Sequence, residues 1–348
     1  MSVTAARGFR ASGVTAGIKA SGRPDVALVV NDGPDQSAAA VFTANRFAAA
    51  PVHWSRQVVA DGEVHAVVVN SGGANACTGP EGFSDTHSTA ERVAALLSTG
   101  AGEVAVCSTG LIGERLPMDR LLSGIDQAAT ALSSSGGPDA AVAIMTTDTV
   151  PKTVVVQADG FTVGGMAKGA GMLAPGLATM LVVITTDARA DAPMLDAVLR
   201  DATHVTFDRI DSDGCMSTND TVLIMASGAS GVAPARQELA SAVTAACADL
   251  ALQLIRDAEG ASKDIRIDVV HAASEDDAIE VARAVSRSNL LKCAIHGEDP
   301  NWGRVLSAVG TTGAAFEPDQ VDVAINGVWV CRSGGVGEER SLVNLAGR

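Results

Sequence analysis

The stretch from Gly164 to Asp187, GGMAKGAGMLAPGLATMLVVITTD, constrains the fold more than any other part of the chain. Its first half, 164–176, is dense in glycine and proline, which disfavour regular helices and strands, so we expect an irregular loop. Its second half, Met180 to Thr186, is an apolar, β-branched run typical of a buried strand. Thr179 therefore stands where the expected loop meets the expected strand.

Length and charge restrict the class of protein. The 348 residues suffice for one large or two moderate domains, and with 47% hydrophobic but only 3% aromatic residues the core must be aliphatic. A formal net charge of −15, without a Lys/Arg-rich run, disfavours binding to nucleic acid or to anionic membranes. The N-terminus lacks the apolar core of a signal peptide, and no apolar run approaches the ~18 residues of a membrane span. We expect a cytoplasmic protein.

Metal and disulfide chemistry are not indicated. The six histidines form no H-x-x-x-H or H-E-x-x-H pair, so no metal site is expected. The six cysteines lie far apart without a C-x-x-C, which is typical of buried free thiols in a reducing compartment.

Turn signals indicate the sheet type. Asp159-Gly160 and Asn326-Gly327 each separate two apolar runs and predict β-hairpins. The pattern predicts roughly ten strands and six helices that do not alternate strictly. They include strands at 264–271 and 290–295 and a helix that begins with Ser88 as its cap. We expect an α/β (α+β) fold in which helices cover mixed or antiparallel sheets.

Thr179 could act as a nucleophile if the peptide bond before it were cut. Its new α-amino group would titrate near pH ~8 and could serve as base for the same residue's hydroxyl. Ala178 leaves room around the carbonyl to be attacked, and the preceding glycines permit the backbone strain that self-cleavage requires. The alternative is that Thr179 merely starts a strand, and the local pattern leaves both interpretations open.

A family resemblance bears on this choice. The block from Lys168 to Ala188 strongly resembles the ornithine acetyltransferases (glutamate N-acetyltransferases) of arginine biosynthesis. Further blocks resemble that family's signatures in the same order, and together they cover nearly the whole chain: 70–79, 107–117, 144–152, 217–223, 257–263 and 297–306.

The resemblance implies a layered αββα-type sandwich like that of N-terminal-nucleophile enzymes, and a precursor that cleaves itself between Ala178 and Thr179. An alpha chain, 1–178, and a beta chain, 179–348, would assemble two plus two into a heterotetramer. Thr179 would take the acetyl group of N2-acetylornithine and release ornithine, and glutamate would then accept it as N-acetylglutamate. No cofactor is implied, although many members also use acetyl-CoA as a donor, and the sequence does not decide that point.

Site residues follow from the same resemblance. Thr109 and Gly110 match the oxyanion-hole pair of the family. The positions that match substrate-binding residues are Thr146, Lys168, Thr179 and Glu259. Physically, Lys168 could pair with a substrate carboxylate and Glu259 with the ornithine ammonium. Further residues lie in signature blocks as supports of the site or as turns: Asn219, Asp220 and Asn301 to Arg304.

One departure and two alternatives remain. Family members usually continue beyond SLVNLAGR, Ser341 to Arg348, with a segment that binds substrate, so we expect the family's C-terminal tail to be missing and assign no residues there. An N-terminal-nucleophile amidohydrolase or aminopeptidase would share the self-cleavage but pass the acyl group to water. A truncated, non-catalytic amino-acid-binding protein would keep the site without turnover.

Overall fold

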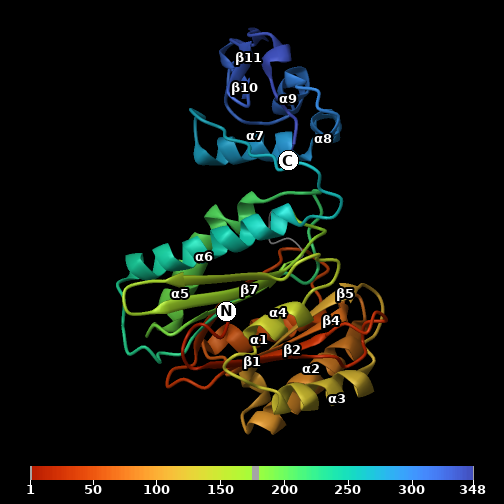
Figure 1. Ribbon diagram of the computed structural model, residues 1–348, viewed down its shortest axis with the longest axis vertical. Helices are drawn as coiled ribbons and strands as arrows, with labels where there is room; N and C mark the ends of the chain where they lie inside the picture. Colours follow the sequence, from red (N-terminus) through yellow and green to blue (C-terminus); the bar gives the residue numbers. More distant parts are fainter. Residues whose placement is uncertain (1, 175–179, 348) are drawn as a thin grey trace. The chain divides into compact units, whose positions relative to one another are not determined.

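A computed structural model describes residues 2–174 and 180–347, so Ala178 and Thr179 lie outside the described residues. The chain divides into two compact units (Figure 1). The first unit comprises Met1–Ile210 and Gly214–Glu259, and the second comprises Asp211–Asp213 and Gly260–Arg348. The amino-acid composition does not change at this division. The division also does not coincide with the predicted boundary at 178–179.

Two sheets build the first unit. Sheet A has the order β1 (Phe9–Val14), β2 (Val26–Asn31), β4 (Ala66–Gly73), β5 (Val104–Leu111). Sheet B has the order β3 (Ser37–Phe42), β9 (Thr221–Ala226), β8 (Leu181–Thr186), β7 (Thr162–Lys168), β6 (Lys152–Gln157). The pairs β4–β5 and β8–β9 are parallel and the other neighbours are antiparallel, so the predicted mixed sheets are confirmed.

Alternation along the strands produces four layers. In β2, Ala27 and Val29 join a core shared with sheet B, whereas Leu28 and Val30 face the helices of the other side. Those helices are α2 (Gly79–Leu97) and α3 (Met118–Thr130), and α5 (Ala192–Val205) and α6 (Arg236–Arg256) cover the outer face of sheet B. Figure 1 shows the resulting order of helices, sheet, sheet and helices. The predicted αββα sandwich is therefore confirmed.

Two shorter helices complete the first unit. α1 (Ala50–Val58) packs on β5 and α2, and α4 (Gly137–Ala143) packs on β1 and β2. The small residues of α4 enter the core between the sheets.

The strand that follows the predicted cleavage point lies inside sheet B. β8 pairs with β7 on one side and β9 on the other, and every residue of Leu181–Thr186 is buried. Leu181 and Val183 point into the core between the sheets, while Val182 and Ile184 face α5 and α6. The buried strand predicted for 180–186 is thus confirmed, within one residue.

The loop predicted over 164–176 is wrong in its first part, because Gly164–Lys168 form the second half of β7. Gly164 pairs with Thr185 of β8. A Cβ on Gly164 would lie 2.5 Å from the backbone oxygen of Ser2. Glycine here permits close packing of the N-terminal segment on the sheet, which the sequence alone presented as a loop signal.

Three other local predictions are wrong. α2 begins at Gly79 with Pro80 in its first turn, so Ser88 lies inside the helix. The segment 264–271 forms no strand. The run 290–295 belongs to helix α8 (Asn289–His296), capped by the Ser288 hydroxyl, which accepts a hydrogen bond from the Leu291 amide. Short apolar runs do not distinguish strand from helix, and the cap decides here.

The second unit is smaller. Helices α7 (Glu275–Arg287), α8 and α9 (Trp302–Val309) enclose a core that includes Val285 and Leu291. A three-stranded sheet of β10 (Val323–Ile325), β11 (Val328–Arg332) and β12 (Gly335–Val336) accompanies them. Asn326 and Gly327 both have positive φ and join β10 to β11, as the hairpin signal predicts.

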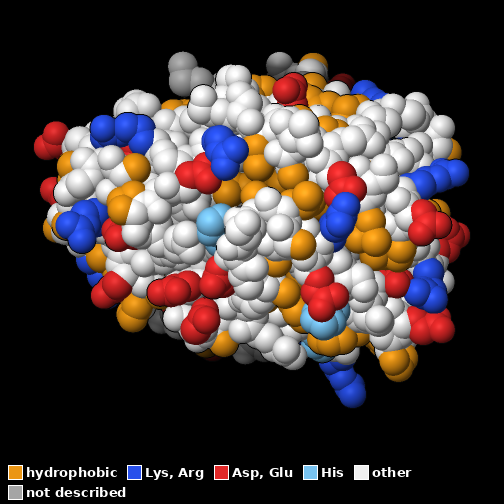
Figure 2. All heavy atoms as spheres, turned by 90° about the horizontal axis from the view of Figure 1, so that it is seen from below, with side chains coloured by type: hydrophobic (Ala, Val, Ile, Leu, Met, Phe, Trp, Pro, Cys, Tyr) orange, Lys and Arg blue, Asp and Glu red, His pale blue; other side chains and the backbone are white. Residues whose placement is uncertain are grey.

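α6 is, among the described residues, the one helix long and apolar enough in composition to cross a membrane. Eight of its side chains, Leu239, Leu250 and Leu254 among them, are buried in the core on sheet B, as in a core helix of a globular protein. On the face drawn in Figure 2, the described acidic and basic side chains are interspersed and no broad basic patch gathers.

Candidate functional site

Two predicted site residues meet where β5 and β7 end. The Lys168 Nζ donates a hydrogen bond of 2.9 Å to the Thr109 Oγ1, although 59 residues separate them. Both side chains are buried, at 1% and 2% exposure. β5 belongs to sheet A and β7 to sheet B, so packing of the two sheets creates this contact. Because the Thr109 oxygen accepts from the ammonium group, its own hydroxyl proton is available to another acceptor.

Gly110 follows Thr109 in a backbone conformation that favours glycine, with φ of 137°. A Cβ there would lie 2.5 Å from the backbone atoms Gly72 C and Gly73 N. The close approach of β4 and β5 at this end therefore requires glycine. A backbone held this tightly keeps the Thr109–Gly110 pair in one geometry.

Asp148 connects Thr146, a predicted site residue, with Lys152 and with the backbone just after Lys168. Its Oδ1 accepts hydrogen bonds from the Gly169 amide at 2.7 Å and from the Lys152 Nζ at 2.6 Å, and its Oδ2 accepts from the Thr146 amide at 2.9 Å. Burial raises the pKa of Asp148, but the charges of Lys168 and Lys152 outweigh it, so the pKa lies below its usual value. Asp148 is therefore an ionised carboxylate that ties Thr146 to the end of β7.

Burial acts in the opposite direction on Lys168. It lowers the pKa of the Lys168 ammonium, and the carboxyl groups of Asp148 and Asp220 counteract it. A buried cation in such surroundings makes strong electrostatic interactions with any charge that develops nearby.

Glu259 lies beside the loop that follows β7. Its amide donates to the Ala170 carbonyl at 2.7 Å, and its carboxyl group would lie 3.2 Å from a Cβ on Gly171. Two residues earlier, the Asp257 Oδ2 accepts from the Lys152 Nζ at 2.6 Å. The end of α6 is thereby joined to the residues around Asp148.

Asp220 anchors the backbone at the start of β8. Its Oδ1 accepts a 3.0 Å hydrogen bond from the Met180 amide, the residue that follows Thr179. Its Oδ2 is buried and has no hydrogen-bond partner among the residues described. Burial raises the pKa of Asp220 well above its usual value, although the Met180 bond lowers it. Asp220 therefore holds the backbone directly after the predicted cleavage point.

Asn219 braces the same region. Its Nδ2 donates to the carbonyls of Ala74 at 2.6 Å and Ser108 at 2.8 Å. The start of β9 is thus bonded to the ends of β4 and β5. Asn219 and Asp220 therefore both hold backbone groups close to predicted site residues.

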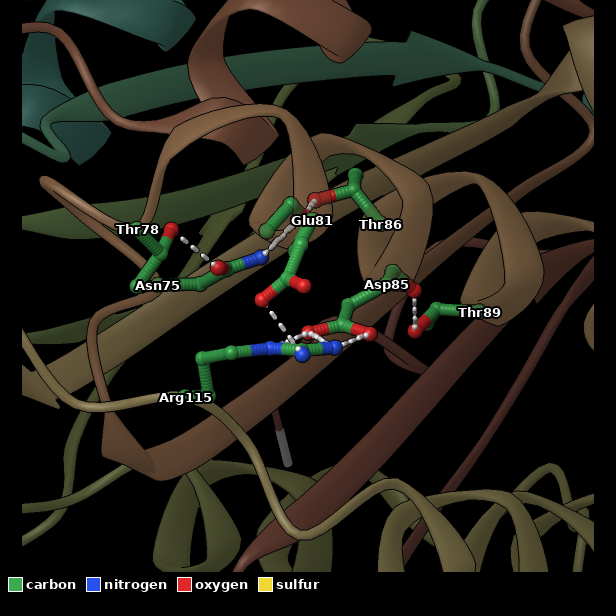
Figure 3. Close-up of polar contacts among 8 residues, drawn as sticks. Asn75, Thr78, Glu81, Asp85, Thr86, Thr89 and Arg115 are labelled. Carbon is green, nitrogen blue, oxygen red and sulfur yellow. Dashed lines mark hydrogen bonds and ion pairs between the residues drawn. The ribbon is translucent and has the colours of Figure 1, made fainter.

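The signature blocks 70–79 and 107–117 are held together by a polar cluster on α2 (Figure 3). The Arg115 guanidinium binds Asp85 and Glu81, each at 2.7 Å. Asn75 donates to the Gly82 carbonyl at 2.8 Å and to Thr86 at 2.9 Å. These contacts fix the loops that leave β4 and β5, so this part of the resemblance has a structural basis.

The predicted site residues divide into three groups. The first unit pairs Lys168 with Thr109, next to Gly110, joins Thr146 through Asp148 to the end of β7, and places Glu259 beside the adjoining loop. Thr179 lies outside the described residues. Asn301 to Arg304 belong to the second unit, at the start of α9, and are described only within it.

Sequence reasoning missed the buried ionic network of Asp148, Lys152 and Asp257. One signal was present, because Asp148 and Lys152 stand four residues apart inside the block 144–152. Acid and base at that spacing resemble an ordinary surface pair, and only burial distinguishes this one: both side chains are fully buried.

Known proteins resemble this chain over nearly its whole length. The family model described as "ArgJ family" matches residues 10–346. The arginine biosynthesis bifunctional protein ArgJ of Streptomyces coelicolor is 71% identical over 345 residues, which span 99% of this chain and 90% of that protein. The protein of the same name from Thermobifida fusca is 63% identical over 348 residues, 100% of this chain and 91% of its own.

A solved structure is also similar. It is that of ornithine acetyltransferase complexed with ornithine from Mycobacterium tuberculosis, 60% identical with a TM-score of 0.50. The match covers 96% of that chain but 52% of this one.

Proposed function

The chain belongs to the ArgJ family, and from this premise we propose that it transfers the acetyl group of N2-acetylornithine to glutamate through an acyl-Thr179 intermediate. It is an enzyme of arginine biosynthesis, a glutamate N-acetyltransferase. The observation that carries the proposed mechanism is the bond between the Lys168 Nζ and the Thr109 Oγ1. A second bond, from the Met180 amide to Asp220, holds the residue directly before β8. That arrangement suits an oxyanion site facing a nucleophile at position 179.

Maturation comes first. The Thr179 Oγ attacks the Ala178 carbonyl carbon, the C–N bond breaks, and an ester forms between Ala178 and the Thr179 side chain. Water hydrolyses the ester and leaves Thr179 with a free amino group. The bond from the Met180 amide to Asp220 restrains the backbone directly after Thr179, which limits the orientations the nucleophile can adopt.

Transfer then proceeds in two half-reactions. The Thr179 amino group takes the hydroxyl proton as Oγ attacks the acetyl carbonyl of N2-acetylornithine. The Thr109 hydroxyl and the Gly110 amide stabilise the resulting oxyanion, each donor being worth roughly 10²–10³ in rate. Ornithine leaves with the proton on its amine. Glutamate's amine attacks the acetyl-Thr179 ester by the same route and releases N-acetylglutamate.

Lys168 acts through Thr109 in this scheme. Its ammonium group donates one hydrogen bond that orients the Thr109 hydroxyl. Its positive charge also stabilises the oxyanion, and the effect is strong because the site is shielded from water. This assignment differs from the substrate-carboxylate partner expected from the resemblance. Glu259 retains the expected role, because its carboxylate lies beside the loop after β7, where an ornithine ammonium can approach.

The proposed mature protein consists of chains 1–178 and 179–348, two of each, in the cytoplasm. One comparison supports the cleavage. The matched chain of the Mycobacterium tuberculosis structure is covered to 96%, yet it accounts for only 52% of this chain. This is expected if the relative consists of two chains, of which one is matched. The relatives' description as bifunctional supports a second activity, for which we propose glutamate acetylation from acetyl-CoA.

Intact mass spectrometry tests the proposal. The purified protein should give two species that correspond to 1–178 and 179–348, and incubation with N2-acetylornithine alone should add one acetyl group to the second. Thr179→Ala should remain uncut and inactive, whereas Thr179→Ser, which keeps a hydroxyl, should cleave and retain activity. A single full-length species that still transfers acetyl groups would contradict the mechanism.

Acceptor dependence distinguishes transfer from hydrolysis. With glutamate omitted, N2-acetylornithine should be consumed only to the extent of one acetyl group per site. Steady release of ornithine without glutamate would instead indicate an amidohydrolase. Replacing N2-acetylornithine by acetyl-CoA tests the second donor.

A further inference from the structure

Lys152 is a buried cation to which the proposed mechanism assigns no step. It is the first residue of β6, and its side chain is fully buried. Its Nζ donates to the Asp148 Oδ1 and to the Asp257 Oδ2, each at 2.6 Å. A buried ion pair often stabilises a fold no more than well-packed apolar side chains would. These three charges are therefore better explained by the geometry that they impose on the surrounding chain.

One set of contacts runs from Lys152 to the end of β7. The Asp148 Oδ1 that binds Lys152 also accepts a 2.7 Å hydrogen bond from the Gly169 amide. Gly169 directly follows Lys168, the last residue of β7, and both are buried. Through Asp148, Lys152 therefore fixes the backbone at the point where the loop after β7 begins.

A second set of contacts runs from Lys152 to the end of α6. Asp257 follows the last residue of that helix, and its carboxylate also accepts hydrogen bonds from the Thr149 amide, at 2.9 Å, and from the Thr149 hydroxyl. Burial raises the pKa of Asp257, but the hydrogen bonds from Lys152 and Thr149 outweigh it, so the pKa lies below its usual value. The ionised Asp257 carboxylate thus holds the chain two residues before Glu259.

The two sets of contacts meet at Glu259. Its amide donates a 2.7 Å hydrogen bond to the carbonyl of Ala170, the residue after Gly169. The contacts and the chain between them close a ring that consists of Lys152, Asp257, Glu259, Ala170, Gly169 and Asp148. The backbone of Glu259 is therefore restrained from two directions, while the residue itself is exposed and its carboxylate can reach a ligand.

We propose that Lys152 is a positioning residue that holds the Glu259 carboxylate in place for the side-chain ammonium group of ornithine and its N2-acetyl derivative. The inference rests on the proposed function, which gives Glu259 that ammonium group as its partner. Lys152 acts indirectly, by fixing the Glu259 backbone against the end of β7. A misplacement of about 1 Å weakens such a contact strongly, because charge-assisted hydrogen bonds are short.

Two ligands isolate the ammonium contact. Ornithine and norvaline share the α-groups and the carbon chain, and only ornithine carries the terminal ammonium group. Neither has an acyl group to transfer, so calorimetry can measure both on the mature protein. Lys152→Met should weaken ornithine binding roughly tenfold, the loss of one charge-assisted contact, and leave norvaline binding unchanged. A loss of folded protein would instead reduce the number of binding sites for both ligands alike, without changing the ratio of their affinities.

A double variant tests whether Lys152 acts through Glu259. Glu259→Gln removes the partner of the ammonium group and should weaken ornithine binding by roughly tenfold or more. Lys152→Met combined with Glu259→Gln should bind ornithine little more weakly than Glu259→Gln alone, because the group that Lys152 positions is already lost. Fully multiplicative losses would overturn the positioning role, as would equal losses for ornithine and norvaline.

Asp257→Asn is a second variant that decides the question if Lys152→Met does not fold. It keeps the shape of the side chain and removes its charge, so the ratio of ornithine to norvaline affinity should fall severalfold. The matched control is Asp249→Asn on the same helix. Asp249 is exposed and accepts a 3.2 Å hydrogen bond from Gln253, so removing its charge should leave both affinities at the wild-type values.

The role of Lys152 and the proposed function fail separately. Unchanged ornithine affinity in Lys152→Met and Asp257→Asn would overturn the role of Lys152, while acetyl transfer by the wild type would leave the proposed function standing. A wild type that binds ornithine no better than norvaline would also overturn that role. A wild type that prefers ornithine but transfers no acetyl group would overturn the proposed function, and the affinity ratios of the variants would still decide the role of Lys152.

Discussion

Among single residues, Lys168 has the contact that bears most directly on the proposed mechanism, its hydrogen bond to Thr109. A buried ammonium group that donates to a threonine hydroxyl determines which way that hydroxyl can donate. The same bond places the Lys168 ammonium group 2.9 Å from the Thr109 oxygen, the proposed oxyanion donor. The rate effect of Lys168 should therefore depend on Thr109.

Replacing Lys168 by Met should lower kcat about 10²-fold, because both the orientation of the Thr109 hydroxyl and the charge behind it are lost. Thr109→Ala should cost roughly 10²–10³. The double variant should be little slower than Thr109→Ala alone, since Lys168 acts through the missing hydroxyl. Single-turnover acetylation of Thr179, followed by mass spectrometry, measures all three, and fully multiplicative losses would contradict the coupling.

Asp148 leads to a prediction about pH and stability. The charges of Lys168 and Lys152 lower the pKa of Asp148 in the folded protein, against the effect of burial. Ionised Asp148 therefore stabilises the fold fully at pH values above its unfolded-state pKa of ~3.9. This stabilisation is lost as the pH falls through the folded-state pKa. Asp148→Asn should reduce the free energy of unfolding at neutral pH by about 3 kcal/mol, the lower end for a broken buried pair, because Asp257 still pairs with Lys152.

Urea unfolding between pH 3 and pH 7 measures this difference. The stability of Asp148→Asn should depend less on pH than that of the wild type over the acidic part of the range. The exposed pair of Arg92 and Asp126 supplies the control, and Asp126→Asn should change stability little. Parallel pH curves for the wild type and Asp148→Asn would refute the assignment.

At the scale of elements, β7 shows how glycine can serve a strand. Gly164 and Gly165 are buried and paired on both sides, yet glycine is a weak strand former. The geometry explains the choice, because the N-terminal segment crosses the sheet at Gly164 with its Ser2 carbonyl 2.5 Å from where a Cβ would be. The element is stabilised by its neighbours and not by its own propensity.

Gly164→Ala should therefore destabilise the protein by about 1–3 kcal/mol, the usual cost of overpacking, because the backbone of Ser2 must move. Gly102→Ala is the matched control, since no heavy atom lies within 4 Å of the Cβ it would add. Thermal unfolding of both variants gives the comparison. If Gly164→Ala were as stable as Gly102→Ala, the close approach of the Ser2 backbone would not contribute to the stability change.

At the scale of the whole molecule, the predicted cleavage point does not separate the two units. Sheet B combines β3, β6 and β7 from the first predicted chain with β8 and β9 from the second, and β8 is bonded on both edges. The core between the sheets likewise includes residues from both predicted chains. A cut before Thr179 would leave this sheet and core intact.

The two pieces should accordingly remain together after cleavage. Mature wild type and uncut Thr179→Ala should elute identically in native size-exclusion chromatography, while denaturing electrophoresis shows two bands for the first and one for the second. Separation of the pieces should require denaturant, since it demands unfolding of sheet B. Dissociation of the cleaved protein in native buffer would contradict the shared sheet.

Several features follow from interactions between residues close together in the sequence. The β-branched run 180–186 forms a strand, and Asp159-Gly160 and Asn326-Gly327 form hairpins, because these signals depend on a few neighbouring residues. The ordered signature blocks identified the family, which brought the αββα architecture with it. The strand predicted for 290–295 is wrong because Ser288 caps a helix there, although its apolar residues are equally compatible with a strand.

The contacts within the site depend on packing between distant parts of the chain. Lys168 pairs with Thr109, and Asp220 holds the Met180 amide, although each pair is far apart in sequence. Both contacts depend on how the sheets and loops pack. Burial raises the pKa of Asp220, whereas the charges of Lys168 and Lys152 lower that of Asp148 against the effect of burial. Desolvation and long-range contact are properties of the packed chain, so no local pattern encodes them.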